Sequence, residues 1–212
     1  MIFKGGTALR LCFYEDYRYS ADLDFSLRGA TVSDAEVVLR EALNAAAAEV
    51  GFPVLELVDG SNAGIAYQGP LGRVRSAKVD IAEDELVVTT TVRPLIQRYS
   101  DQAAAEITTY TLDEVAAEKL RCVIQRLQCR DIFDLHHLLV RENVDVETAW
   151  ALFDEKARHK NIDPTLFGQR LDEREPRYRQ LWQDELEDHL GAEPPAFEET
   201  IRQLRRVLRA HL

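Results

Sequence analysis

The chain has 212 residues, of which 46% are hydrophobic and 30% charged, as expected of a globular protein with one large domain or two small ones. No stretch approaches the roughly 20 apolar residues of a membrane span, and the N-terminal residues lack the zones of a signal peptide. The net charge of −11 argues against a protein that coats nucleic acid, because phosphate binding needs a basic face. It leaves room for a local basic patch formed by Arg73, Arg75 and Lys78.

The cysteines and histidines give no sign of a metal site. Cys12, Cys122 and Cys129 are odd in number and lack metal-ligand spacing, which favours a reduced, cytoplasmic protein over a secreted one. The adjacent pair His136-His137 falls in a helical stretch. We expect these two side chains to have a surface or packing role.

The first half of the chain combines strand and helix patterns. Helices are predicted over 7–14 and over 33–50, the second with Ser33 as N-cap and Glu36 completing a capping box. Alternating polarity predicts a strand over 22–27. Further strands, separated by glycine and proline turn signals, are expected at 54–58, 64–68, 73–81, 86–91 and 106–110.

From residue 112 onward the apolar spacing becomes helical. Pro164, Pro176 and Pro194-Pro195 each fall at a predicted helix start, where proline is tolerated. The sequence therefore predicts an α+β fold, with a mixed part over 1–110 and a helical part over 111–212. The expected helices are 112–127, 130–141, 146–158, 163–171, 176–189 and 196–211. Lys156, in the third of these, is expected to be solvated.

Two aspartates in the strand predicted over 22–27 are the first candidates for chemistry. Asp22 and Asp24 are two residues apart, so both carboxylates point to one face of the strand. Such carboxylates repel each other unless a cation lies between them, and their oxygens suit Mg²⁺ together with substrate phosphates. Gly5-Gly6, directly before the first helix, would let the backbone approach a phosphate. Taken alone, two aspartates with this spacing more often belong to an exposed acidic edge strand than to a metal site. Taken alone, a pair of glycines more often forms a plain turn than a phosphate-binding loop.

A third carboxylate lies in the strand predicted over 73–81. Lys78 and Asp80 share one face of this strand, and small or apolar residues form the other. Asp80 on a neighbouring strand would complete a carboxylate triad suited to phosphoryl or nucleotidyl transfer. The alternative is that Lys78 and Asp80 form the solvated face of a half-buried strand.

The helical half contributes a lysine and two acids. Lys119 lies in the apolar stripe of its helix, where a lysine either extends to solvent or points into a site; we expect it to bind a triphosphate. Asp131 and Asp134 share one side of the next helix, and one of them could orient Lys119 or Arg130. Asp131 could instead be an acid that the helix dipole favours at an N-terminus.

Five runs of residues, in this order, resemble the AbiEii/AbiGii toxin family, which includes the MenT toxins. The match extends over about residues 3 to 140, and the joint pattern is specific although each run is weak alone. The resemblance implies a polymerase-β-like nucleotidyltransferase fold followed by a helical half, and a toxin neutralised by a separately encoded antitoxin. The runs are Lys4-Gly5-Gly6-Thr7-Ala8-Leu9, Arg18-Tyr19-Ser20-Ala21-Asp22-Leu23-Asp24-Phe25, Lys78-Val79-Asp80-Ile81, Glu118-Lys119 and Arg130-Asp131-Ile132-Phe133-Asp134-Leu135.

The resemblance also implies roles for individual residues. Asp22, Asp24 and Asp80 would hold Mg²⁺, and Asp80 would also polarise the attacking hydroxyl. Lys119 would bind the triphosphate of the NTP, and Asp134 would complete the catalytic set. Some family members add nucleotides to the 3′ end of tRNA, so the implied substrates are an NTP and tRNA. The implied nucleotide-binding residues are Gly5, Gly6, Thr7, Ser20, Lys78 and Lys119.

The chain begins almost at its glycine run, whereas family members usually have a few dozen residues upstream. We therefore expect a truncated or shortened member. Three other functions stay open: nucleotide transfer to a protein hydroxyl, a glycosyltransferase that uses the Asp22-x-Asp24 pair, and a chain that only binds nucleotide or antitoxin. Lys78, Asp80 and the helical half disfavour the glycosyltransferase.

Overall fold

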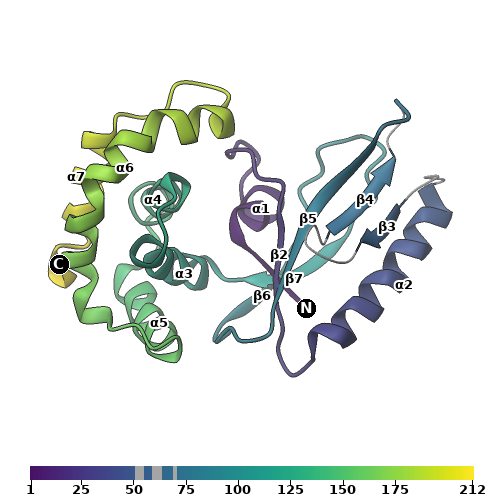
Figure 1. Ribbon diagram of the computed structural model, residues 1–212, viewed down its shortest axis with the longest axis horizontal. Coiled ribbons are helices and arrows are strands. Elements are labelled where there is room, and N and C mark those ends of the chain that lie inside the picture. The colour runs from purple at the N-terminus through teal and green to yellow at the C-terminus, as the bar shows by residue number, and fades with distance from the viewer. Residues whose placement is uncertain (51–54, 59–63, 69–70) are drawn as a thin grey trace. The chain divides into compact units, whose positions relative to one another are not determined.

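The computed structural model describes residues 1–50, 55–58, 64–68 and 71–212 (Figure 1). The chain forms two compact units, and two short segments of its first half, Asp16–Tyr19 and Leu86–Thr91, belong to the second one. No periodicity in the sequence indicates that assignment. The first unit comprises Met1–Glu15, Ser20–Glu85 and Val92–Thr109, and the second adds Tyr110–Leu212 to the two short segments.

A seven-stranded mixed sheet forms most of the first unit, with the strand order β3-β4-β5-β2-β1-β7-β6. β2 pairs antiparallel with β1 and parallel with β5, while β3, β4 and β5 pair antiparallel in succession. The strands are β1 (Ile2–Lys4), β2 (Leu23–Ser26), β3 (Leu55–Val58), β4 (Gly64–Gln68), β5 (Val74–Ala82), β6 (Thr90–Pro94) and β7 (Glu106–Tyr110).

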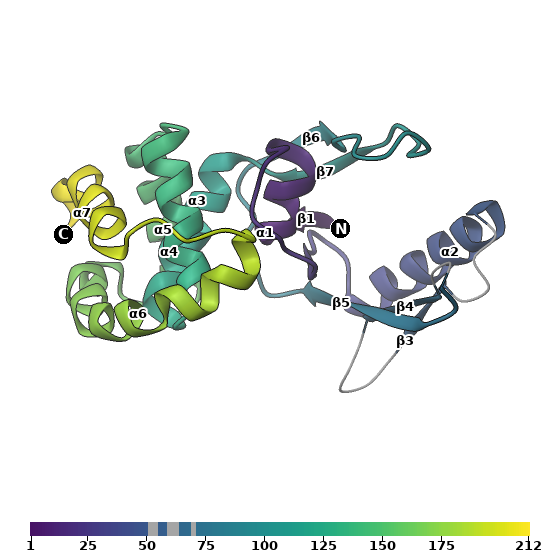
Figure 2. The same cartoon turned by 90° about the horizontal axis from the view of Figure 1, so that it is seen from above.

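Two helical elements accompany this sheet. α1 (Gly5–Ala8) follows β1 directly and continues as a π-helical segment over Leu9–Phe13, and α2 (Val32–Val50) packs against β3 (Figure 2). On β3 the exposed residues Glu56 and Val58 alternate with half-buried leucines, so one face of this strand is open to solvent.

The predicted N-cap of α2 was wrong. Thr31, not Ser33, caps the helix: its Oγ1 accepts a hydrogen bond from the backbone N–H of Asp34 (3.2 Å), and the Asp34 carboxylate accepts one from the Thr31 N–H (3.1 Å). This reciprocal pair is a capping box that starts two residues earlier than predicted. The strand β1 was also missed, because three residues are too few to show an alternation.

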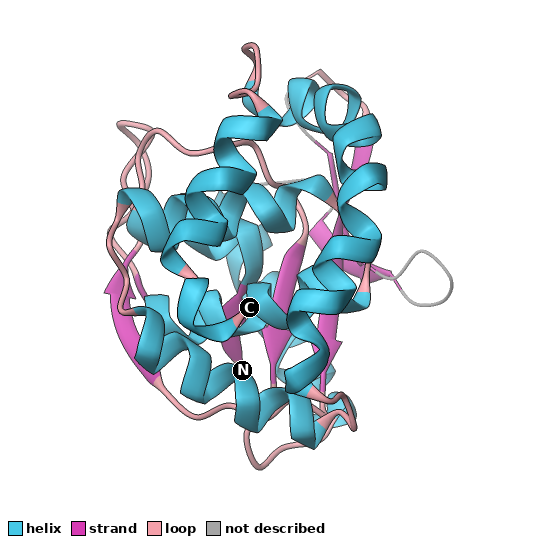
Figure 3. Ribbon diagram, turned by 90° about the vertical axis from the view of Figure 1, so that its left-hand side faces the viewer, coloured by secondary structure: helices cyan, strands magenta, loops and turns pink. Residues whose placement is uncertain are grey.

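The second unit is helical (Figure 3). α3 packs mainly on α5, and α4 packs on α6 and α7. The helices predicted over 163–171 and 176–189 form one helix, α6, with Pro176 in its interior, so the helix start predicted there was wrong. The helices are α3 (Leu112–Gln125), α4 (Cys129–His136, continued as a π-helical segment over His137–Arg141), α5 (Val146–His159), α6 (Phe167–Leu190) and α7 (Phe197–Val207).

The strand predicted over 86–91 is largely absent, since only Thr90 and Thr91 belong to β6. The backbone N–H groups of Val88 and Thr89 donate to the two carboxylate oxygens of Glu114, at 3.1 Å each, instead of to a neighbouring strand. A buried acid of α3 therefore replaces the strand pairing. The predicted α+β fold with a helical second half is confirmed.

Candidate active site

Gly5 lies where β1 turns into α1, with a backbone φ of +76°. A Cβ at this position would lie 2.5 Å from Oδ2 of Asp24. Backbone strain and this collision both exclude larger residues. Gly5 therefore allows the start of α1 to lie against the Asp24 carboxylate, and the register of β1 and β2 places Lys4 opposite Asp24 on the same face.

Asp24 and Asp80 lie directly opposite each other on the parallel strands β2 and β5. Paired residues of neighbouring strands project to the same face, so both carboxylates belong to one face of the sheet. Lys78 shares that face, with its ammonium 3.8 Å from Asp80, and both of these side chains are more than half exposed. Asp22 precedes β2 and is half-buried. The strand register thus places Asp80 beside Asp24 on a neighbouring strand, as predicted.

Ser20 is tied to the first helical segment. The Thr7 hydroxyl donates to Ser20 Oγ at 2.9 Å, and an Arg10 guanidinium nitrogen lies 3.5 Å from the Ser20 carbonyl oxygen, which it contacts as donor. Thr7 and its neighbour Gly6 are buried. These contacts hold Ser20, two residues before Asp22, close to α1 and the π-helical segment that follows it.

Within the described ranges, no three histidine, cysteine, aspartate or glutamate side chains are grouped so as to hold a metal ion. Mg²⁺ does not require such a cage, because it is commonly bound by one or two carboxylates, waters and substrate phosphates. The carboxylates of Asp24 and Asp80 supply hard oxygen donors of that kind from two adjacent strands. The donor set therefore fits Mg²⁺ bound together with a nucleotide.

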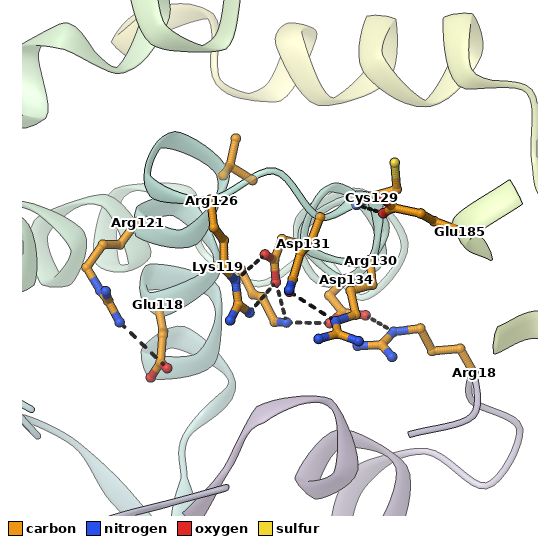
Figure 4. A network of polar contacts seen from close by, with 12 residues as sticks. Arg18, Glu118, Lys119, Arg121, Arg126, Cys129, Arg130, Asp131, Asp134 and Glu185 are labelled. Atoms are coloured by element: carbon orange, nitrogen blue, oxygen red, sulfur yellow. Dashed lines mark hydrogen bonds and ion pairs between the residues drawn. The ribbon is translucent and has the colours of Figure 1, made fainter. Parts of the chain in front are cut away.

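In the second unit, Lys119 and Asp134 belong to a buried network of ion pairs (Figure 4). The Lys119 ammonium lies 2.9 Å from Asp131 and 2.7 Å from Asp134. Arg18 binds both carboxylate oxygens of Asp134, at 2.5 and 2.6 Å, and Arg126 binds both oxygens of Asp131, at 2.8 and 3.0 Å. Three cations and two anions thus alternate through the network.

This network sets the charge states of its members. Burial would lower the pKa of Lys119, but the attraction of Asp131 and Asp134 outweighs it and holds that pKa above its usual value. Burial would raise the pKa of Asp134, but Arg18 and Lys119 hold it well below its usual range. The pKa of Asp131 is lowered in the same way, by Lys119 and Arg126. All members are therefore charged at neutral pH.

The prediction that Asp131 or Asp134 orients Lys119 is confirmed for both acids. Asp131 is a fully buried ion-pair partner, not merely an acid at a helix N-terminus. The triphosphate-binding role of Lys119 stays a prediction, and its ammonium already contacts two carboxylates. The sequence reasoning gave no role to Arg18 or Arg126. Arg18 is part of the second run of residues that resembles the family, four residues before Asp22, and this position was the one sign in the sequence that it has a functional role.

Lys156 was expected on a solvated face of its helix, and this expectation was wrong. Its side chain is 1% exposed, and its ammonium lies 2.7 Å from the buried carboxylate of Glu114. It also donates to the Leu86 carbonyl oxygen at 2.6 Å and lies over the ring of Tyr110. Glu114 is N-terminal in α3, so this pair joins α3, α5 and the segment Leu86–Thr91.

The histidine pair has the expected packing role. His136 is 5% exposed, and its Nε2 lies 2.7 Å from the side-chain oxygen of Gln203 on α7. The His137 ring packs edge-on against Tyr17, with 5.0 Å between ring centroids. The three cysteines are free and buried.

Comparison with known proteins identifies the family. The family model described as the nucleotidyl transferase AbiEii toxin of type IV toxin–antitoxin systems matches residues 1–203. The chain belongs to the AbiEii family. It is therefore a nucleotidyltransferase toxin of a type IV toxin–antitoxin system, for which the family implies an NTP substrate and an antitoxin partner. The resemblance read from the five runs of residues is confirmed.

A solved structure supports the fold. MenT4, a nucleotidyltransferase toxin from Mycobacterium tuberculosis, aligns with a TM-score of 0.57 and 21% identity, over 99% of this chain and 84% of that one. An antigenic nucleotidyltransferase-like protein from Paracoccidioides brasiliensis aligns with a TM-score of 0.43 and 14% identity, over 81% of this chain and 83% of that one. No curated protein matches the chain. Among the described helices, none has the length and apolarity to cross a membrane.

Proposed function

We propose that this AbiEii protein transfers a nucleoside monophosphate from an NTP to the 3′ end of tRNA, in a Mg²⁺-dependent reaction at Asp22, Asp24 and Asp80. The observation that supports the site most strongly is that Asp24 and Asp80 are paired residues of neighbouring strands. In addition, Gly5 allows the start of α1 to lie against the Asp24 carboxylate. In the proposed assignment the 1–110 part supplies the carboxylates, and the 111–212 part supplies Lys119 and Asp134.

The proposed reaction is an in-line displacement. The oxygen of the acceptor hydroxyl forms a bond to the α-phosphorus, the bond from that phosphorus to the bridging oxygen breaks, and pyrophosphate leaves with the electron pair. Asp80 accepts the hydroxyl proton, and backbone N–H groups at Gly5 and Gly6, with Thr7, Ser20 and Lys78 nearby, contact the phosphates. Mg²⁺, when bound, neutralises charge that develops on the phosphate oxygens. Positioning supplies much of the remaining rate enhancement.

Two features support an RNA acceptor. Arg73, Arg75 and Lys78 are all exposed along or just before β5, the strand that bears Asp80, and add positive charge to this strand of an otherwise acidic chain. The second feature is the family resemblance of the sequence, because some members of that family use tRNA as the acceptor. Asp134, held between Arg18 and Lys119, would position Lys119 for the triphosphate.

Nucleotide transfer is tested with purified protein, Mg²⁺, total tRNA and each of four NTPs labelled on the α-phosphate, with Asp22→Ala alongside. The proposal predicts label on tRNA with the wild type only, and the preferred NTP identifies the donor. Label on a protein instead would establish transfer to a protein hydroxyl. Absence of label from every acceptor, with folded protein, would support a chain that only binds nucleotide or antitoxin.

A further inference from the structure

A cavity of about 420 Å³ lies wholly within the second unit, and none of the residues that line it is among those assigned above to Mg²⁺. Its walls come from residues 16–18, from α4 and the π-helical segment that follows it, and from the end of α6 and its connection to α7. The volume is in the range of sites that hold small organic ligands. The described structure gives this cavity no role in the transfer step.

One wall of the cavity is aromatic and apolar. The ring of Tyr17 lies edge-on to His137, and its centroid is 6.3 Å from that of Phe133. Leu190 and Pro195 also line the cavity. The Tyr17 hydroxyl donates to Asp134 at 2.8 Å, which fixes the ring within the wall. Such a wall suits a flat heterocycle, because any nucleic-acid base can stack on an aromatic side chain.

The polar part of the cavity has one cation available for an anionic ligand. Arg141 is exposed, and within the described ranges no carboxylate pairs with its guanidinium. Arg18 also lines the cavity, but Asp134 occupies its guanidinium. Asp16 also lines the cavity, and Glu142, which follows Arg141 in the chain, lies 3.5 Å from His137. An aromatic wall beside an available guanidinium matches a base joined to a phosphate.

We infer that this cavity binds one nucleotide of a single-stranded RNA, with its base against Tyr17 and His137 and its phosphate at Arg141. The inference rests on the proposed function, since the RNA is taken to be the acceptor strand. Tyr17 precedes Asp22 by five residues, so the cavity wall and the first proposed metal ligand belong to one short stretch of chain. Single-stranded ends are the RNA elements whose bases are free to stack on protein side chains.

The test measures RNA binding without catalysis. A fluorescein-labelled single-stranded trinucleotide, cytidine-cytidine-adenosine, is titrated with full-length protein in EDTA and without NTP, so that no transfer occurs. Binding should weaken about five- to 150-fold in Tyr17→Leu, the loss that removal of one base–aromatic stack produces, and also weaken in Arg141→Gln. Tyr17→Phe keeps the ring and should bind like the wild type. Arg177→Gln, an exposed arginine of α6 outside the cavity, is the charge-matched control.

A second measurement locates the ligand. In the wild type, the ring protons of His136 and His137 should shift in NMR spectra when the unlabelled trinucleotide is added, and they should not shift in Arg141→Gln. Equal affinities of wild type, Tyr17→Leu and Arg141→Gln, or unshifted histidine signals at saturation, would overturn the inference. A protein that binds the trinucleotide in this way but transfers no label to tRNA would contradict the proposed function and leave the cavity assignment standing.

Discussion

Asp24 on β2 lies opposite Asp80 on β5, in the register of two parallel strands. Their side chains share a face of the sheet although 55 residues of chain lie between them. Since two like charges on one face repel, the arrangement is stable at neutral pH only with water, Lys78 or a bound cation to screen it. In the proposed site, a nucleotide and a metal ion would complete this carboxylate pair together.

Metal binding should therefore depend on the nucleotide. No three-ligand metal group exists among the described side chains, so the phosphates of a bound nucleotide would have to supply further ligands. We therefore expect Mg²⁺ to bind at least about tenfold more tightly with a non-hydrolysable NTP analogue than without it, as measured by isothermal titration calorimetry. EDTA should abolish transfer, and added Mg²⁺ should restore it. Equal Mg²⁺ affinity with and without the analogue would mean that the protein alone forms the metal site.

Substitution of Lys119 should reduce stability as well as any nucleotide affinity. Lys119→Met leaves Asp131 and Asp134 with one cation each, and loss of one partner from a buried ionic network costs about 3–5 kcal/mol. Urea denaturation measures this loss. The Arg126 side chain is 47% exposed, so Arg126→Met should lower the free energy of unfolding by less. In folded Lys119→Met, a raised KM for the NTP would support triphosphate binding, while an unchanged KM would limit Lys119 to a positioning role.

The buried pair of Lys156 and Glu114 predicts a similar contrast on α5. Lys156→Met should lower the free energy of unfolding by about 3–5 kcal/mol, because the Glu114 carboxylate loses its cation while fully buried. Arg158→Met, on the same helix, removes an exposed pair with Asp154 and should cost about 0.5 kcal/mol or less. Equal urea midpoints for the two variants would contradict the assignment of Lys156 to the core.

Stability should also decline between neutral and mildly acidic pH. Burial lowers the pKa of His136 and of His137 below the ordinary 6.5, so both bind fewer protons folded than unfolded. Their contribution is complete above pH 6.5 and is lost as pH falls through 6.5 toward the lowered values. Asp131 and Asp134, whose pKa values are also lowered, add a loss only below about pH 3.8. Urea unfolding at pH 7.5 and 5.5 checks this, and His136→Gln should reduce the difference.

Local patterns predicted much of the fold. The strands at 64–68 and 106–110 were predicted with their observed ends, because alternation and turn residues bound them. One error came from a tertiary contact that periodicity does not encode, since Glu114 captures the backbone N–H groups of Val88 and Thr89. A second concerned Pro176, which is exposed and lies inside α6 instead of at a helix start.

The candidate site was predictable in part for the same reason. Asp24 and Asp80 lie within strands whose polarity alternates, so the face that each carboxylate occupies could be inferred from spacing. The environment of Lys119 could not, because its partner Asp134 also binds Arg18, a residue 116 positions away in the chain. Lys156 was misplaced because a lysine near the end of an amphipathic helix is usually solvated, and only the tertiary position of Glu114 reverses that expectation.

The central claim is that the Asp24–Asp80 pair performs nucleotidyl transfer, and one rate comparison tests it most directly. Asp80→Asn removes a carboxylate from an exposed position, so the fold should persist, and labelled transfer to tRNA should fall at least about 100-fold, as expected when several kcal/mol of charge stabilisation are lost. Glu56→Gln makes the matched change at an exposed residue of β3, where transfer should stay at the wild-type rate. Equal transfer rates for Asp80→Asn and Glu56→Gln would contradict the account.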